Sequence, residues 1–243
     1  MTDTVEKTAT GAILYDRQVI STIDESRFVA SNWLHSEPIE GRLGSGGRGN
    51  TMFVGNIPRQ FVLRHYIRGG LIGKYVKDKY VWTGADASRP FREWRMMAKM
   101  ADSGLRVPRP AAARYTRIGP FYTADLITVR VPNVRALSTW IHERAGGEKF
   151  WQGLGDAIYQ FHAKGVFHAD MNAYNLQIDS AGDLWMLDFD RGKLLAAGAW
   201  QQRTLGRLHR SLQKIKLRDP ALHYDESCWE QLLAGYFNAS KSA

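Results

Sequence analysis

The residues of this sequence that could carry out chemistry gather between Val166 and Lys193. His168, Asp170 and Asn175 lie in one short polar loop, and Asp188 follows after two apolar runs. Carboxylate and amide oxygens are ligands that suit Mg²⁺, and the ion usually keeps positions for water and for substrate phosphates. The residue types therefore indicate a magnesium-dependent reaction at a phosphate group.

A predicted β-hairpin positions these polar residues. Residues 176–178 and 184–187 are apolar runs typical of short strands, and a Ser-Ala-Gly turn separates them. Because strands joined by a tight turn pair side by side, the hairpin would bring Asp170, Asn175 and Asp188 to a common edge.

The order H-x-D-x-x-x-x-N, strand pair and second aspartate resembles the catalytic and metal-binding segment of the protein-kinase-like fold. The second motif departs from the usual D-F-G, because residues 188–192 read D-F-D-R-G. Together with the loop H-A-D-M-N-A-Y-N, this departure is most similar to the small bacterial lipopolysaccharide sugar kinases, and among them to the 3-deoxy-D-manno-octulosonic acid (Kdo) kinases. The resemblance extends over nearly the whole chain.

The resemblance implies a role for each residue of the loop. Asp170 would orient the acceptor hydroxyl and accept its proton, while Asn175 and Asp188 would hold Mg²⁺ against the phosphates of ATP. His168 would brace the loop without a direct chemical role. The reaction would be phosphoryl transfer, which depends more on positioning and charge neutralisation than on covalent work by the protein.

Three charged residues accompany the second motif. Asp190 is either a second metal ligand or the partner that holds Arg191, and the sequence leaves both readings open. Arg191 and Lys193 come just after the proposed metal ligands, so they are candidates to meet an anionic acceptor.

A glycine-rich segment further upstream predicts a phosphate-binding loop. Without a Cβ, glycine lets backbone N–H groups approach phosphate oxygens. In a dinucleotide-binding unit a helix would follow directly, whereas residues 51–54 and 61–66 look like strands, as in the nucleotide lid of kinases. A glycine-rich hairpin without a ligand is the alternative. The glycines of the G-x-G-x-x-G pattern are Gly44, Gly46, Gly47 and Gly49.

Two charged residues would complete the nucleotide site. Kinases carry a phosphate-binding lysine on the third strand, and Arg64 occupies that position here. Arginine can bind phosphate bidentately but is not equivalent to lysine, so this is either an adapted phosphate contact or a degenerate site. Glu93, on a helix predicted to begin after Ser88 and to end at Gly104, would orient Arg64; a solvated charge is the alternative.

The elements predict an α+β fold of the bilobal, protein-kinase-like type. Residues 1–127 would form a nucleotide-binding lobe with an antiparallel sheet and one main helix. Residues 128–243 would form a mainly helical catalytic lobe with the hairpin, and both lobes would make one kinase-like domain. The first ten residues are polar and expected to be loose, and residues 12–23 are expected to form an edge strand or two.

The composition is that of a folded protein with anionic partners. Of the 243 residues, 44% are hydrophobic, and the formal net charge is +9. That charge fits nucleic acid, an anionic membrane or a phosphorylated substrate. The single cysteine, Cys228, excludes an internal disulfide, and we find neither a secretory signal nor an apolar run long enough to span a membrane. We therefore expect a cytoplasmic protein.

A predicted helix near the C-terminus separates basic from apolar residues. At about 100° per residue, its two stripes stand on opposite faces. The helix is either a surface helix buried on one side or a cationic face for anionic lipid headgroups. The apolar stripe is Leu205, Leu208, Leu212 and Ile215, and the basic stripe is Arg203, Arg207, Arg210 and Lys214.

The residues themselves indicate a Mg·ATP phosphotransferase with an anionic partner. The family resemblance implies more. It implies phosphorylation of the 4-hydroxyl of Kdo on a lipid A precursor during assembly of the lipopolysaccharide inner core. The protein would act peripherally on the cytoplasmic face of the bacterial inner membrane, where its positive charge suits an anionic surface.

Three alternatives stay open. A heptose kinase of the lipopolysaccharide core would share the catalytic residues and differ only in its acceptor. An atypical protein kinase is less favoured, because neither a long activation segment nor an A-P-E motif follows Lys193. A non-catalytic pseudokinase or RNA-binding module is disfavoured by the complete set of metal ligands, and nucleic acid is accordingly the less favoured partner.

Overall fold

The computed structural model describes residues 2–39, 51–56, 59–67 and 78–241. The chain divides into two compact units: unit 1 is Met1–Gly104 with Pro108–Val131, and unit 2 is Leu105–Val107 with Pro132–Ala243. The division anticipated after residue 127 falls inside the last strand of unit 1, a few residues before that unit ends.

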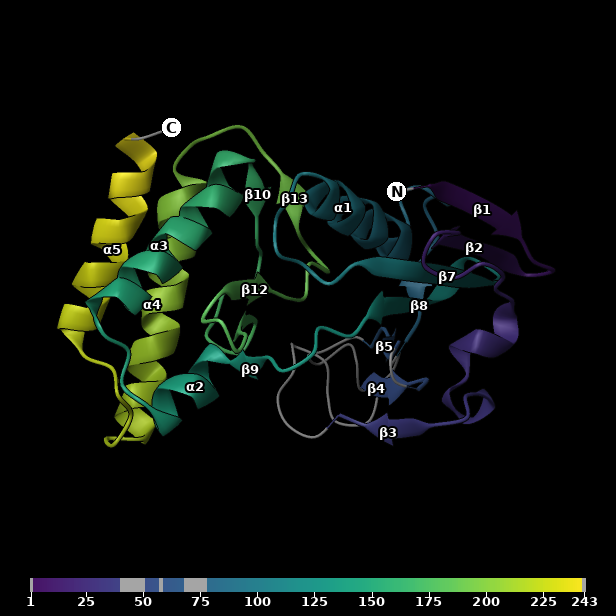
Figure 1. Ribbon diagram of the computed structural model, residues 1–243. Coiled ribbons are helices and arrows are strands. Elements are labelled where there is room, and N and C mark those ends of the chain that lie inside the picture. Colours follow the sequence, from purple (N-terminus) through teal and green to yellow (C-terminus); the bar gives the residue numbers. More distant parts are fainter. Residues whose placement is uncertain (1, 40–50, 57–58, 68–77, 242–243) are drawn as a thin grey trace. The chain divides into compact units, whose positions relative to one another are not determined.

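Unit 1 is built on one antiparallel sheet of eight strands, in the order β1-β2-β7-β8-β5-β4-β3 with β6 paired to β8 (Figure 1). Two short 3₁₀ helices connect β2 to β3. The strands are β1 (Asp3–Lys7), β2 (Gly11–Asp16), β3 (Ser36–Pro38), β4 (Thr51–Val54), β5 (Phe61–His65), β6 (Tyr80–Val81), β7 (Pro110–Ile118) and β8 (Phe121–Val129), and the 3₁₀ helices are η1 (Glu25–Phe28) and η2 (Ala30–Asn32).

The N-terminal strands correct the expectation of a loose start. Residues 3–7 form β1, which is the edge strand, whereas β2 lies inside the sheet between β1 and β7 and ends at Asp16. The sequence of β1, DTVEK, lacks the alternation of a half-buried strand. Its place at the edge explains why, because an edge strand needs only one hydrogen-bonded neighbour and can keep most side chains in water.

Helix α1 (Arg89–Asp102) packs against β7 and β8 of unit 1 (Figure 1). It begins and ends as predicted: Ser88 stands at the N-cap position and Gly104 follows the C-cap with φ of 82°. The Ser88 hydroxyl does not cap the helix, since it donates a hydrogen bond to the Ala85 carbonyl (2.6 Å). Phe91 and Trp94 are buried and fix the helix to the sheet.

Unit 2 is mainly helical and contains the predicted hairpin. Strand β11 pairs with β12 in the register Leu176 opposite Met186, β9 pairs with the other side of β11, and β10 pairs with β13. The elements are β9 (Arg135–Ala136), α2 (Leu137–Glu143), α3 (Glu148–Ala163), β10 (Val166–Phe167), β11 (Leu176–Ile178), β12 (Leu184–Met186), β13 (Lys193–Leu194), α4 (Trp200–Arg218) and α5 (Glu226–Lys241).

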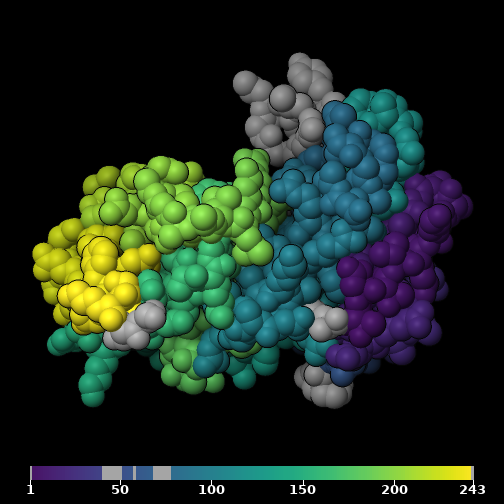
Figure 2. All heavy atoms as spheres, turned by 90° about the horizontal axis from the view of Figure 1, so that it is seen from above, coloured from purple at the N-terminus to yellow at the C-terminus, as the bar shows by residue number. Residues whose placement is uncertain are grey.

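Helices α3 and α5 approach each other through glycines. A Cβ on Gly155 would lie 1.9 Å from the Leu232 carbonyl oxygen, and one on Gly235 would lie 2.0 Å from the Gln152 carbonyl oxygen. Only glycine allows backbones to come this close. The pair forms a framework for the predicted catalytic loop, because α3 leads directly into β10. Figure 2 shows α5 (yellow) at the surface of unit 2.

The predicted fold class is therefore confirmed: an antiparallel sheet with one main helix, followed by a mainly helical unit that contains the hairpin.

Candidate active site

His168 anchors the predicted catalytic loop from inside unit 2. Its Nδ1 accepts a hydrogen bond from the Asp170 backbone N–H (3.1 Å), so the ring proton resides on Nε2, which donates to the Leu187 carbonyl (2.8 Å). Burial lowers the pKa of His168, while the Leu187 bond and the nearby carboxylates of Asp188 and Asp170 act in the opposite direction. The ring is thus a neutral brace, as predicted, between the loop and the end of the hairpin.

Asn175 ties the same two segments together. Its side-chain Nδ2 donates to the Asp170 carbonyl (2.8 Å), and its backbone carbonyl accepts from the Leu187 N–H (2.9 Å). Asn172 closes the turn between them, since its Oδ1 accepts from the backbone N–H groups of Tyr174 (2.9 Å) and Asn175 (3.1 Å). The hairpin thus brings the loop next to the segment that ends in Asp188.

The side-chain oxygen of Asn175 is a candidate ligand position. Asn175 is buried, and its Oδ1 has no hydrogen-bond partner among the described residues. An unsatisfied buried acceptor costs about 1–3 kcal/mol. Amide oxygen is a suitable donor for Mg²⁺, so the predicted ligands Asn175 and Asp188 fit the ion. The described residues contain no group of three or more His, Cys, Asp or Glu that could hold a metal. The proposed pair is not such a group, because it consists of one asparagine and one aspartate.

Asp188 has an unusual backbone. Its φ is 63°, in the left-handed region that side chains other than glycine rarely adopt. Such strain costs about 1–3 kcal/mol and occurs most often at functional sites. The next residue holds this conformation in place: Phe189 is buried, and its ring lies 5.1 Å from that of His168. A turn follows, in which the Gly192 N–H donates to the Phe189 carbonyl (2.8 Å).

The other residues of the second motif lie around this turn. Asp190 is partly buried and Arg191 is exposed. Lys193 is exposed on β13, which pairs with the strand that leads into the loop. Their roles as metal ligand or acceptor contacts stay predictions.

Asp170 offers its carboxylate to solvent. Its side chain is 44% exposed, and the Asp170 Oδ1 lies 3.5 Å from the Nη1 of Arg207 on α4. The sequence predicted Arg207 only as part of a basic helix face and gave no signal that it would stand beside Asp170, the predicted catalytic residue. Its position results from the packing of α4 on the loop, where the Ala173 N–H donates to the Ser211 hydroxyl (3.2 Å).

In unit 1, Arg64 and Glu93 form the predicted pair. The Arg64 Nη2 lies 2.5 Å from the Glu93 Oε1, and the Glu93 side chain is only 2% exposed. Tyr66 completes the network: its hydroxyl donates to Glu93 Oε2 (2.5 Å) and accepts from Arg64 Nη2 (3.2 Å). Glu93 is therefore a buried partner and not a solvated charge. The contact of Arg64 with nucleotide phosphates stays a prediction.

The glycine-rich segment, with Gly44, Gly46, Gly47 and Gly49, lies outside the described residues. The strands expected after it are present, since β4 begins at Thr51 and pairs with β5. A strand at this point is the kinase-like order and not that of a dinucleotide-binding unit.

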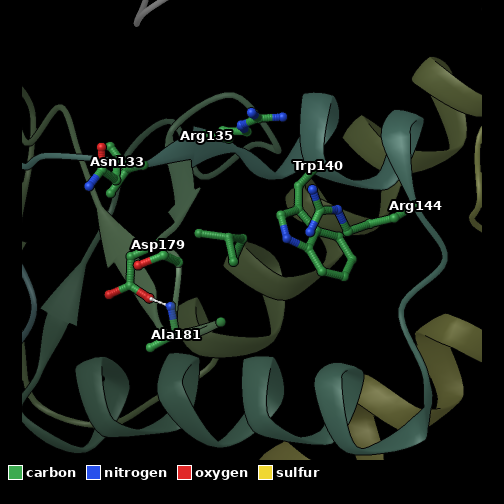
Figure 3. A pocket seen from close by; sticks show the side chains of 10 residues that line it. Asn133, Arg135, Trp140, Arg144, Asp179 and Ala181 are labelled. Atoms are coloured by element: carbon green, nitrogen blue, oxygen red, sulfur yellow. Dashed lines mark hydrogen bonds between the residues drawn. The ribbon is translucent and has the colours of Figure 1, made fainter.

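A separate pocket of about 570 Å³ in unit 2 contains none of the predicted site residues. It lies beside the turn of the hairpin and is lined by α2, β9 and that turn (Figure 3). The Trp140 ring stacks on Phe150 with centroids 4.0 Å apart, and the Arg144 guanidinium lies 5.5 Å from the Trp140 ring. No sequence motif pointed to it.

The polar loop, the hairpin and the buried Arg–Glu pair define a kinase-like phosphotransferase. A family model described as the lipopolysaccharide kinase (Kdo/WaaP) family matches residues 40–236. The chain belongs to this family.

Two relatives are named 3-deoxy-D-manno-octulosonic acid kinase. The protein of Xanthomonas euvesicatoria pv. vesicatoria (strain 85-10) is 41% identical over 209 residues, 85% of this chain and 82% of the relative. That of Stenotrophomonas maltophilia (strain R551-3) is 40% identical over 208 residues, with the same coverage of 85% and 82%.

Solved structures of WbdD are similar at lower identity. One has a TM-score of 0.48 and 14% identity over 86% of this chain, which spans 46% of that one. Another, described as the bifunctional kinase-methyltransferase WbdD, also has a TM-score of 0.48 and 14% identity, and this chain spans 47% of it.

Proposed function

We propose that the protein transfers the γ-phosphate of Mg·ATP to the 4-hydroxyl of a Kdo residue on a lipid A precursor, a step of lipopolysaccharide inner-core biosynthesis. Membership of the lipopolysaccharide kinase family and relatives named Kdo kinase support this acceptor. The observation that carries the chemistry is the loop in which His168 and Asn175 fix the backbone of Asp170 but leave its carboxylate half exposed.

Each residue has one task in this proposal. Asp170 orients the acceptor hydroxyl and accepts its proton as the phosphorus–oxygen bond forms. Asn175 Oδ1 and the Asp188 carboxylate would hold Mg²⁺, which when bound neutralises charge on the ATP phosphates. Asp190 is either a further ligand or the partner of Arg191.

The residues of unit 1 would serve the nucleotide. Arg64 neutralises phosphate charge, and Glu93 with Tyr66 keeps the guanidinium in one orientation. The glycine-rich segment, whose backbone N–H groups can approach phosphate oxygens, covers the phosphates.

The protein would work on the cytoplasmic face of the inner membrane as a peripheral protein. The net charge of +9 supports attraction to an anionic lipid surface. No helix in the described part of the chain is long and apolar enough to cross a membrane.

The test is a transfer assay with γ-labelled ATP and Mg²⁺. A Kdo-bearing lipid A precursor is offered beside a heptosylated acceptor and a generic protein substrate. Label on the Kdo residue, located by mass spectrometry of the product, is the expected result. Label only on heptose would overturn the acceptor, and label only on protein would overturn the substrate class. ATP binding without transfer to any acceptor would count against the proposed reaction, and absence of Mg·ATP binding would favour a non-catalytic module.

A further inference from the structure

Helix α4 exposes a row of cations, the α4 ridge, defined as Arg203, Arg207, Arg210 and Lys214. All four are exposed, while Leu205, Leu208 and Leu212 on the other face are buried. Their spacing keeps them on one helix face. The same face ends in Leu217, which is 85% exposed.

The ridge is fixed beside the proposed catalytic loop. Arg207 Nη1 lies 3.5 Å from Asp170 Oδ1, and one helical turn further on Ser211 accepts a hydrogen bond from the Ala173 N–H (3.2 Å). The hydrogen bond between Ala173 and Ser211 ties α4 to the loop, and Arg207 stands one turn away beside the Asp170 carboxylate. From Arg207, which stands beside the carboxylate that would activate the acceptor, the ridge continues along the helix through Arg210 and Lys214.

The charge of the ridge is not neutralised within the described part of unit 2. Asp170 is the one carboxylate there within 4 Å of a ridge cation, and Arg203, Arg210 and Lys214 have no ion-pair partner among the described residues. Like charges one turn apart on a helix destabilise it slightly. Gly206 lies within this helix, and the Arg210 Nη1 lies 3.4 Å from the position that a Cβ on Gly206 would take.

The contact between Arg207 and Asp170 is easily exchanged. At 3.5 Å it is too long for a strong hydrogen bond, and the two side chains are 52% and 44% exposed. An ion pair of this kind contributes little stability. An incoming anion can replace the Asp170 carboxylate as the partner of Arg207 and leave that carboxylate for the acceptor hydroxyl.

We propose that the α4 ridge binds the acceptor itself, which deepens the proposed function and rests on it. Arg207 binds the carboxylate of the acidic sugar whose hydroxyl Asp170 activates. Arg210 and Lys214 bind further anionic groups on the lipid to which the sugar is linked. Leu217, about 15 Å along the helix from Arg207, contacts the apolar part of that lipid. Arg207 is thus a substrate-binding residue, and the ridge determines specificity for an anionic glycolipid.

The first test separates the ridge from general charge. The double variant Arg210→Ala/Lys214→Ala is compared with Arg92→Ala/Lys99→Ala, which removes the same charge from exposed positions on α1. With the Kdo-bearing lipid in neutral detergent micelles, we expect the acceptor KM of the ridge variant to rise about tenfold, since each lost cation weakens anion binding severalfold. Its KM for ATP and both constants of the α1 variant should stay within twofold of wild type.

A second arm identifies the source of the anion. Sedimentation with phosphatidylglycerol vesicles that lack the acceptor measures binding to a membrane alone. If the ridge variant lost vesicle binding but kept its acceptor KM in neutral micelles, the ridge would be a membrane surface and the proposal would be wrong. An equal rise in KM for the α1 variant would also overturn it, because the effect would then be one of net charge.

The third test addresses Arg207 and the sugar carboxylate. Arg207→Ala and methyl esterification of the acceptor carboxyl should each raise the acceptor KM about tenfold, and the two changes together should raise it no further. Arg207→Lys should recover part of the loss. Additive effects would overturn the assignment of Arg207 to the carboxylate.

Binding of the glycolipid without ATP, measured by equilibrium dialysis of the micelles, keeps this inference separate from the reaction. If wild type bound the glycolipid through the ridge but transferred no phosphate, the proposed function would fail while the site stood. If wild type bound no glycolipid, or ridge and α1 variants bound it equally, the site would fail.

Discussion

The two units use their buried polar groups in opposite ways. In unit 1 the charges neutralise one another: Glu93 is held by Arg64 and Tyr66, and Asp125 accepts from Arg114 (2.8 Å) and contacts His65 (2.7 Å). A buried charge requires such partners, because its desolvation costs several kcal/mol. We call this the closed network because both carboxylates have charged partners within unit 1. The Glu93 part of it holds Arg64 in one orientation.

In the loop of unit 2, the polar side chains form hydrogen bonds mainly with the backbone. His168 and Asn175 bind Asp170 through its main-chain N–H and carbonyl and leave the Asp170 carboxylate half exposed. The Asn175 Oδ1 stays unsatisfied among the described residues, and Asp188 is strained. The difference teaches that unit 1 is arranged for internal stability, while the loop of unit 2 is arranged so that ligands complete it.

Asp170→Asn changes the half-exposed carboxylate in the loop of unit 2 and should have the largest effect on activity. The variant keeps the shape of the side chain and the backbone hydrogen bonds but loses the proton acceptor, so kcat should fall by about 10²–10⁴. Binding of Mg·ATP and the free energy of unfolding should change little. Steady-state transfer assays, nucleotide titration and urea denaturation measure the three quantities.

Asp183→Asn is the matched control for Asp170. Asp183 is also 44% exposed and also pairs with an arginine, Arg106, at 2.6 Å, but it lies at the hairpin turn away from the loop. It should keep near wild-type kcat. Equal losses in the two variants would mean that Asp170 is only a surface ion-pair partner.

Glu93→Gln breaks the closed network and should cost stability as well as function. Arg64 would lose its buried counter-charge, which typically costs about 3–5 kcal/mol when a partner is removed entirely; glutamine keeps some hydrogen bonds, so we expect about 2–3 kcal/mol. The KM for ATP should rise because Arg64 is no longer oriented. A variant of full stability would contradict the description of unit 1 as a closed network.

The histidines of the two units predict opposite responses to pH. In unit 2, burial lowers the pKa of His162 from 6.5 to about 4, so stability is complete above about pH 6.5 and is lost as pH falls toward 4. The loss amounts to at most roughly 3 kcal/mol. In unit 1, the hydrogen bond to Asp125 raises the pKa of His65, so its contribution is present below about pH 6.5 and is lost as pH rises through the raised pKa.

Hydrogen exchange at pH 5 and pH 8, corrected for intrinsic rates and resolved by peptide, separates these responses. Protection of α3 should decrease at pH 5, and protection of β5 should decrease at pH 8. His162→Gln should remove most of the change in α3. A parallel response of both segments in wild type would contradict the contrast between the units.

The sequence was sufficient wherever local pattern decides structure. The hairpin followed from two apolar runs and a turn, and helix α1 from its stripe, its N-cap position and Gly104. What could not be predicted depends on tertiary packing. Glu93 lies off the apolar stripe but is buried, because Arg64 from a distant strand neutralises it. The contact of Arg207 with Asp170 likewise requires the docking of α4, and nothing in the spacing of an aspartate predicts the positive φ of Asp188.

Asp188→Gly should raise stability slightly while it lowers activity, so it separates the backbone strain at this position from the function of the side chain. Glycine adopts φ near 63° without steric cost, so the variant should recover part of the 1–3 kcal/mol of strain, offset by about 0.5–1 kcal/mol of added chain entropy. We expect a gain of about 1 kcal/mol in the free energy of unfolding. Transfer activity should fall at least about 100-fold, because a proposed ligand of Mg²⁺ is lost.

Asp188→Asn separates the two contributions, since asparagine keeps a side-chain oxygen but not the charge and also tolerates the left-handed region. It should retain more activity than glycine at high Mg²⁺ and gain less stability. If Asp188→Gly instead lowered stability, the carboxylate would be a structural partner within unit 2 and not a group held in strain for a ligand. The loop would then be as closed as the Arg64–Glu93 network.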